Sequence, residues 1–299
     1  MHRPATILLA ALALLWLGAS NPVHRPPAGP PGEARASLSE DRTFHVFLLV
    51  GGINMEGRGE LSRSDEQPID GAMIWDPVRK LWVQARAPFR WFSPFMSERN
   101  REGRQWRRLG CGPSFVKAYM KANPGVRVGV ICAPRNHMTV ENWEPGRRPV
   151  PLFDTVVRAT REAMAHEQES SWSQGLKPVL KGILWHDGEP HWHRELDDYF
   201  EAFPRIVRGL RRELAGGEPL PVVFGQLVPF KPYFAPFNGR LLEQAETIPN
   251  SACVTTEGLT GRGNTFDADG YRALGRRYAA AVLELLQPTD GEAAPKKGG

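Results

Sequence analysis

The segment Phe44–Val50, FHVFLLV, is a nearly continuous apolar run that stops at Gly51 and Gly52. A short run rich in Val, Leu and Phe is typical of a strand that is buried on both faces, as in a parallel sheet. The sequence therefore predicts a mostly parallel, five-stranded sheet. The other four strand runs are Val126–Cys132, Val179–Trp185, Pro221–Gln226 and Ala252–Thr255.

Helical spacing of apolar residues separates these runs, in segments that begin near Phe115, Phe153, Leu196 and Tyr271. Strands that alternate with helices predict an α/β fold, a three-layer α/β/α sandwich of the doubly wound, flavodoxin-like kind. In such folds ligands bind at the carboxyl ends of the strands. We expect Pro204 to kink or divide the helix that begins near Leu196. Asp267 or Asp269 is expected to cap the last helix, and Pro288 to end it.

The stretch 60–110 departs from this alternation, because it is polar and rich in Arg and Trp. A connection of this length is usually functional or disordered, and we expect it to lie over the carboxyl edge of the sheet. Exposed indole rings there would stack on sugars, whereas the alternative is that each ring packs the loop onto the sheet. The aromatic residues considered are Trp75, Trp82, Trp91, Phe92, Trp106, Trp143 and Trp192.

The first 20 residues have the pattern of a signal peptide. Arg3 precedes a run of 13 residues, Ala5–Leu17, which is apolar except for Thr6 and is followed by small residues. As a helix this run is roughly 20 Å long, shorter than a bilayer core of about 30 Å. We therefore expect cleavage, no transmembrane span afterwards, and a secreted or periplasmic protein. An uncleaved signal anchor is the alternative.

Composition divides the remainder into a Pro/Gly-rich linker over residues 21–40, one domain over 41–287, and a disordered tail over 288–299. The chain of 299 residues carries 38 Lys+Arg and 33 Asp+Glu, a net charge of +5 that is spread along the sequence, which argues against a nucleic-acid partner. Three cysteines are too few for a disulfide framework or a zinc site of four cysteines. The sequence indicates no cofactor and does not indicate an oligomeric state.

Three passages carry a family resemblance. Residues 48–61 (LLVGGINMEGRGEL), 183–192 (ILWHDGEPHW) and 258–279 (GLTGRGNTFDADGYRALGRRYA) resemble, in order, G-Q-S-N-M-x-G-R-G, W-H-Q-G-E and the G-D-x-x-H-F…LGxRYA ending. These are motifs of the sialate O-acetylesterase-like carbohydrate esterases, a branch of the SGNH (GDSL-type) hydrolases. Residues 112–134 resemble the family's second block. The resemblance implies the SGNH fold and an acylated glycan as the ligand.

The resemblance also implies a catalytic triad, but the three triad positions carry unsuitable residues. The nucleophilic serine falls on Ile53, the general base on Thr265, and the aspartate that orients the base on Arg262. Isoleucine offers no lone pair, a threonine hydroxyl cannot act as a base near neutral pH, and arginine repels an imidazolium ion. No serine occurs between residues 41 and 61 and no histidine after residue 193, so a shifted alignment restores neither group.

The surrounding positions keep groups that the resemblance assigns to substrate binding. Gly52 and Asn54 follow the first strand, and Gly112 occupies the position of a backbone donor to the oxyanion. His186 and Glu189 keep the W-H-x-G-E pattern, but Asp187 replaces the family's glutamine. An ionised carboxylate donates no hydrogen bond to an oxyanion, although it can accept sugar hydroxyls.

These observations favour a carbohydrate- or partner-binding protein that has lost serine-esterase catalysis. One alternative is a hydrolase that uses the His186–His193 cluster, a metal held by His191 and His193 or by His186 and Asp187, or a serine nucleophile. The serines considered are Ser62, Ser64 and Ser93. Another is a purely structural module without a ligand cleft. The five arginines of 99–108 (RNREGRQWRR) are either a solvated loop or an anion-binding patch.

Overall fold

The computed structural model describes residues 43–101, 103–166, 176–191 and 196–287. The expected signal peptide, linker and tail, together with Trp192 and His193, lie outside these residues. Within them, no helix is both long and apolar enough to cross a membrane.

A seven-stranded sheet forms the centre of the fold, with strand order β3-β2-β4-β1-β5-β6-β7. All neighbours pair in parallel except β2 and β3, which are antiparallel. The prediction of a mostly parallel sheet is confirmed, but the sheet has seven strands instead of the five predicted. The strands are β1 (Thr43–Gly51), β2 (Ala72–Asp76), β3 (Leu81–Gln84), β4 (Arg127–Pro134), β5 (Lys177–His186), β6 (Val222–Gly225) and β7 (Ser251–Val254).

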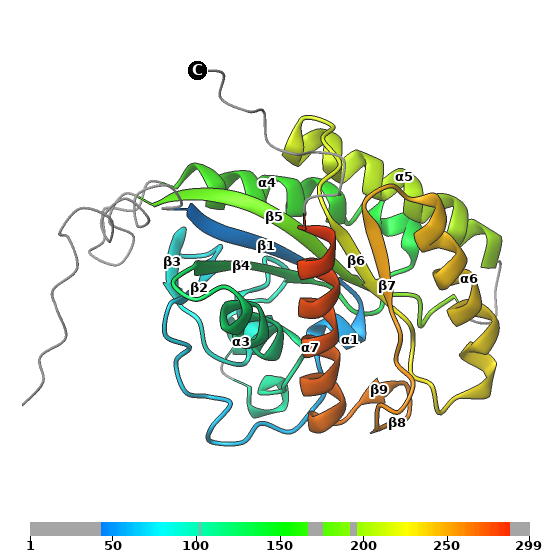
Figure 1. Ribbon diagram of the computed structural model, residues 1–299, viewed down its shortest axis with the longest axis horizontal. Helices are drawn as coiled ribbons and strands as arrows, with labels where there is room; N and C mark the ends of the chain where they lie inside the picture. The colour runs from blue at the N-terminus through cyan, green and yellow to red at the C-terminus, as the bar shows by residue number, and fades with distance from the viewer. Residues whose placement is uncertain (1–42, 102, 167–175, 192–195, 288–299) are drawn as a thin grey trace, which may run out of the picture. The chain divides into compact units, whose positions relative to one another are not determined.

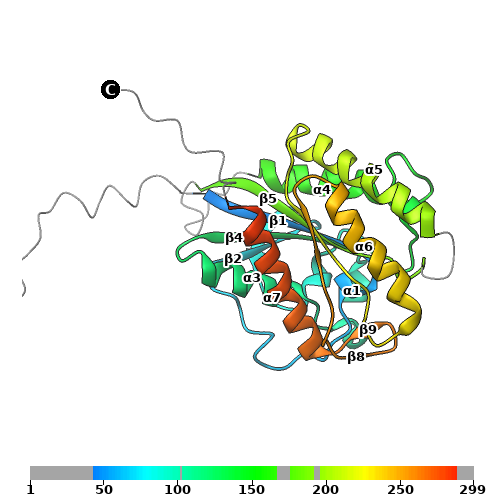
Figure 2. The same cartoon turned by 45° about the vertical axis from the view of Figure 1, so that its right-hand side comes forward.

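Helices cover both faces of the sheet, which confirms the three-layer α/β/α sandwich. Figure 1 shows α3 and α7 on one face and α4 and α5 on the other, and Figure 2 shows α6 alongside α5. The helices are α1 (Ile53–Glu56), α2 (Glu98–Arg101), α3 (Gly112–Ala122), α4 (Leu152–Ala165), α5 (Leu196–Ala215), α6 (Ala235–Thr247) and α7 (Ala268–Leu285). A small hairpin, β8 (Gly261–Arg262) and β9 (Thr265–Phe266), precedes α7.

Of the two outcomes expected at Pro204, a kink or a division of the helix, the division is wrong. α5 is a single helix with Pro204 inside it, so this proline does not divide it. Apolar burial on one side outweighs the lost backbone hydrogen bond, since Phe200, Phe203, Ile206 and Leu210 are all buried. At the last helix, the side chain of Asp267 accepts a hydrogen bond from the backbone N–H of Gly270 at 2.8 Å, which confirms it as the cap.

The two extra strands lie in the stretch that we expected to be a loop excursion. β2 and β3 form a hairpin at one edge of the sheet, and the indoles of Trp75 and Trp82 pack at 5.6 Å between ring centroids. Both rings are buried, as is that of Trp143. For these three residues the packing alternative is therefore correct. Trp91, Phe92 and Trp106 are half-buried.

Candidate functional site

The carboxyl ends of the three central strands lie at the same level. Gly51, the last residue of β1, is in register with Pro134 of β4 on one side and with His186 of β5 on the other. The strands that follow β1 in the chain, β2 to β4, lie on one side of β1 in the sheet, and β5 to β7 lie on the other side. In doubly wound sheets this point, where the strand order reverses, is where ligand sites form.

A tight glycine turn joins β1 to α1 at this point. Gly51 has φ of +133°, and a Cβ there would lie 2.1 Å from the carbonyl oxygen of His186. The backbone of His186 therefore excludes a side chain at Gly51, whereas a Cβ on Gly52 would lie 2.5 Å from Asp187 Oδ1 and would force the Asp187 side chain to move. The N–H of Gly52 donates to the His186 carbonyl at 2.8 Å. This turn presents Ile53 at the carboxyl edge of the sheet.

Asn54 is wholly buried and joins α1 to two distant segments. Its amide nitrogen donates to the carboxylate of Glu189 and, at 2.8 Å, to the carbonyl of Asn264 in the β8–β9 turn. Its amide oxygen accepts from the hydroxyl of Tyr271 at 2.8 Å. Because every polar atom of the amide is used within the protein, Asn54 acts as an internal clamp that holds the hairpin against α1.

This clamp brings the three triad positions of the resemblance into one cleft. Ile53, Arg262 and Thr265 all line an open cleft of about 820 Å³, although more than 200 residues separate Ile53 from the other two. The hydroxyl of Thr265 donates to the carbonyl of Arg262 at 3.2 Å, and the Arg262 side chain is exposed. The cleft is also lined by Arg58, Gly59, Glu60, Gln105, Arg108, Phe266, Asp267, Ala268 and Asp269.

His186, the last residue of β5, and His191, five residues further on, are both buried. His186 is wholly buried, its Nδ1 lies 3.0 Å from the Tyr278 hydroxyl, and burial lowers its pKa to about 3. The Nε2 of His191 accepts the backbone N–H of Val140 at 2.8 Å. A histidine that must stay neutral and a histidine whose lone pair is already used are poorly suited to proton transfer at neutral pH.

Two buried carboxyl groups accompany His186. Burial and the neighbouring Glu189 carboxyl raise the pKa of Asp187 well above its ordinary range, and burial raises that of Glu189 to about 7. Asp187 Oδ2 and Glu189 Oε2 have no hydrogen-bond partner in the described part of the chain. Asp187 and Glu189 are 2% and 8% exposed, and both side chains lie next to Gly52. Their role in substrate binding stays a prediction.

Gly112 lies at the start of α3 within the core. A Cβ at this position would lie 2.5 Å from the ring of Phe89 and 3.1 Å from a methyl group of Leu49. Close packing therefore already requires glycine here. The proposed role of its N–H at an oxyanion stays a prediction.

Cysteine, serine and metal chemistry have little support in the described residues. Burial raises the pKa of Cys111 and of Cys253 to about 12, which keeps both as thiols. Ser93 is buried and donates to the Pro134 carbonyl at 3.1 Å, and Ser62 donates to Asp65 at 2.7 Å. Across residues 43–101, 103–166, 176–191 and 196–287, no three His, Cys, Asp or Glu side chains form a group that could hold a metal ion.

The mostly parallel sheet with helices on both faces and the glycine turn after β1 are those of the three-layer α/β/α fold that the resemblance implies. The model of the family "Carbohydrate esterase, sialic acid-specific acetylesterase" matches residues 43–284. The chain belongs to this family.

Solved structures with the same fold share little sequence with the chain. A protein from Arabidopsis thaliana is 19% identical with a TM-score of 0.64, and the match covers 81% of this chain and 98% of that one. NanS is 13% identical with a TM-score of 0.60, over 81% and 97% of the two chains. A carbohydrate acetylesterase from Xanthomonas citri is 16% identical with a TM-score of 0.54, over 80% and 56%.

Proposed function

We propose that this chain is an exported, carbohydrate-binding member of the acetylesterase family that does not hydrolyse esters by a serine mechanism. One observation carries the proposal: the cleft at the carboxyl edge of the sheet is lined by Ile53, Arg262 and Thr265. Acyl transfer requires a nucleophile with a base in hydrogen-bond reach. Ile53 carries no nucleophilic atom, and neither Thr265 nor Arg262 can act as the base that would activate a hydroxyl near neutral pH.

The cleft chemistry supports a sugar ligand. Three guanidinium groups and three carboxylates line it, together with the amide of Gln105 and the hydroxyl of Thr265. A sugar hydroxyl both donates and accepts hydrogen bonds, so it is matched by a wall that presents donors and acceptors side by side. The volume of about 820 Å³ falls in the range of small-molecule sites.

Arg262 is the residue on which to test this proposal. Its exposed side chain lines the cleft, so Arg262→Ala removes a donor without disturbing the core. Arg276→Ala is a matched control, because Arg276 is exposed on α7 and does not line the cleft. Calorimetry with acetylated oligosaccharides should show binding by wild type and by the control, with binding weakened at least about tenfold in Arg262→Ala.

Mass spectrometry of the recovered oligosaccharides supplies the second half of the test. The ligand should keep its acetyl groups after incubation with wild type. Oligosaccharides that bind equally to the Arg262→Ala variant would place the sugar outside the cleft, and acetate released in proportion to protein would show an active enzyme.

A hydrolase with unconventional residues is the second candidate, and one observation favours it. Glu189 follows β5 and has a pKa of about 7, the range in which a carboxyl group is an effective general base. The base would still need a nucleophile, which could be water. This candidate predicts that Glu189→Gln abolishes any ester hydrolysis by wild type, whereas our proposal predicts no hydrolysis to abolish.

A further inference from the structure

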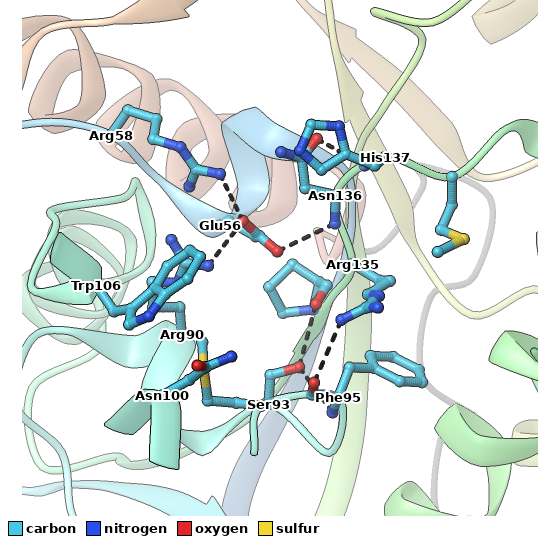
Figure 3. Close-up of a pocket in the computed structure, with 13 residues that line it drawn as sticks. Glu56, Arg58, Arg90, Ser93, Phe95, Asn100, Trp106, Arg135, Asn136 and His137 are labelled. Carbon is cyan, nitrogen blue, oxygen red and sulfur yellow. Dashed lines mark hydrogen bonds and ion pairs between the residues drawn. The ribbon is translucent and has the colours of Figure 1, made fainter. Parts of the chain in front are cut away.

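A second cavity, of about 160 Å³, shares Arg58 with the cleft and is lined by residues from the end of α1, from the end of β4 and the residues after it, and from the 89–106 segment. We propose that this pocket binds a small organic carboxylate. Figure 3 shows Glu56 at its centre, with Arg58, Arg90 and Asn136 reaching it from different sides. The proposal does not depend on what the cleft binds.

Glu56 and Arg90 form the frame of this pocket. Arg90 is only 4% exposed; its Nη2 lies 2.9 Å from Glu56 Oε2, and its guanidinium carbon lies 4.6 Å from the ring centroid of Trp106. Arg58 reaches the same carboxylate oxygen at 2.8 Å. The other oxygen of Glu56 accepts the backbone N–H of Asn136 at 3.0 Å. Both oxygens of this buried carboxylate are therefore already used.

The pocket has more positive charge than its one carboxylate can balance. Arg58, Arg90 and Arg135 line it with Glu56, which leaves a formal excess of two positive charges when His137 is neutral. Arg135 forms no ion pair with any described carboxylate, and its one side-chain hydrogen bond, to the Phe95 carbonyl, is long at 3.4 Å. An anion is the ligand that would balance this excess, because charge-assisted bonds to arginine are among the strongest in proteins.

Donors also exceed acceptors on the pocket walls. Arg90 Nε and Nη1, Trp106 Nε1 and Arg135 Nε are buried and have no acceptor among the described residues. Ser93 Oγ is engaged twice, as a donor to Pro134 and as an acceptor from the N–H of Phe95. Buried donors without acceptors are costly, and a carboxylate brings two acceptor oxygens.

One wall of the pocket is apolar, which favours an organic anion over an inorganic one. Phe95, Met96 and Met138 line the cavity together with Pro134. An aliphatic stem placed against these side chains would lose contact with water, whereas phosphate or sulfate gains nothing there. The small cavity limits that stem to a few carbon atoms. We therefore expect a short-chain carboxylate, with its charged end towards Arg135.

The two methionines make the site directly observable. The chain has 7 methionines, so an NMR spectrum of methionine-methyl-labelled protein contains few resonances. The variants Met96→Leu and Met138→Leu assign the resonances of the two methionines that line the pocket. Titration with propionate should shift these two methyl signals saturably and leave that of Met73, which is buried in β2, unchanged. Propionamide has the same shape without the charge and should cause no saturable shift.

Arg135→Gln should weaken propionate binding at least about tenfold, equivalent to about 1.4 kcal/mol. Arg63→Gln, at an exposed position outside the pocket, should bind as wild type does. Any one of three results would overturn the proposal: no saturable shift with propionate, equal binding by Arg135→Gln, or propionamide or inorganic phosphate binding as tightly as propionate. If Arg135→Gln fails to fold, the comparison of propionate with propionamide on wild type still decides the question.

Discussion

The hydroxyl of Tyr271 donates a hydrogen bond of 2.8 Å to the amide oxygen of Asn54, which joins α7 to α1 across 217 positions of sequence. The amide nitrogen of the same asparagine holds the β8–β9 turn through the carbonyl of Asn264. One buried side chain therefore fixes the position of both walls of the cleft. Its removal should affect the stability of the whole domain.

Asn54→Ala should lower the free energy of unfolding by about 3 kcal/mol, because it leaves several buried polar groups without partners. Tyr271→Phe removes only one hydroxyl and should cost about 1 kcal/mol. In urea denaturation the double variant should lose less than the sum of the two, since they share one hydrogen bond. Lys121→Ala, at an exposed position of α3, is the control and should stay within about 0.5 kcal/mol of wild type. Strict additivity would mean that the bond contributes nothing.

Glu189 should make stability depend on pH. Its pKa rises from 4.5 to about 7 on folding, so between these values the folded chain holds more protons than the unfolded chain, and stability falls as pH rises. His186, with a pKa near 3, has the opposite slope between pH 3 and 6.5 and partly masks this effect. The comparison of wild type with Glu189→Gln separates the two.

As pH rises from 4.5 to 8, the free energy of unfolding of the Glu189→Gln variant should increase relative to that of wild type by on the order of 3 kcal/mol, because glutamine cannot ionise. Urea denaturation at several pH values measures this difference. Glu243→Gln, at an exposed position of α6, should show no such change. A constant difference between Glu189→Gln and wild type across this range would contradict the raised pKa.

The buried pair of Glu56 and Arg90 should contribute strongly to stability. Glu56→Gln leaves the Arg90 guanidinium buried without its counter-charge, at a cost of about 3–5 kcal/mol. Glu66→Gln breaks the ion pair with Arg107, in which the Glu66 side chain is 31% exposed and the Arg107 side chain 44% exposed. This change should lower the free energy of unfolding by less than about 1 kcal/mol. Thermal denaturation of the two variants provides the comparison. Similar melting temperatures would show that Arg90 does not depend on Glu56.

Restoring the triad should require three changes together. Ile53→Ser alone adds a hydroxyl without a base, so a fluorophosphonate probe should not label it. The triple variant Ile53→Ser, Arg262→Asp and Thr265→His supplies the nucleophile, the aspartate that orients the base, and the base together, so the probe should label it at position 53. Asp187→Gln is a further change to combine with these three. If the probe labels the single variant as fast as it labels the triple variant, the chain already holds a base.

The sequence predicted the sheet well because its central strands are buried on both faces. β1 and β4 consist of apolar runs that no helix periodicity matches. β2 and β3 were missed because they are short, at five and four residues, and lie within an arginine-rich stretch. All five residues of β2 are buried, so its short length, and not exposure, hid this strand. β3 is the edge strand, and Trp82 alone of its four residues is buried. Runs this short give a weak pattern.

The site was predictable only where motifs mark it. Ile53, Arg262 and Thr265 were placed by resemblance, and they line one cleft. The carboxylate pocket was missed, because Glu56, Arg90 and Trp106 come from three segments that no local pattern relates. The five arginines of 99–108 were a partial signal: Arg101 pairs with Asp76, Arg107 with Glu66, and Arg108 lines the cleft. The sequence alone does not reveal which of these charges are already balanced.

The central claim is tested most directly by the rate at which purified wild-type protein hydrolyses p-nitrophenyl acetate, measured with and without a chelator. We expect a rate equal to that of buffer, because the cleft presents Ile53 where a nucleophile is needed and Thr265 and Arg262 beside it. Turnover well above buffer that persists with chelator and disappears after covalent serine-esterase inhibition would contradict the account.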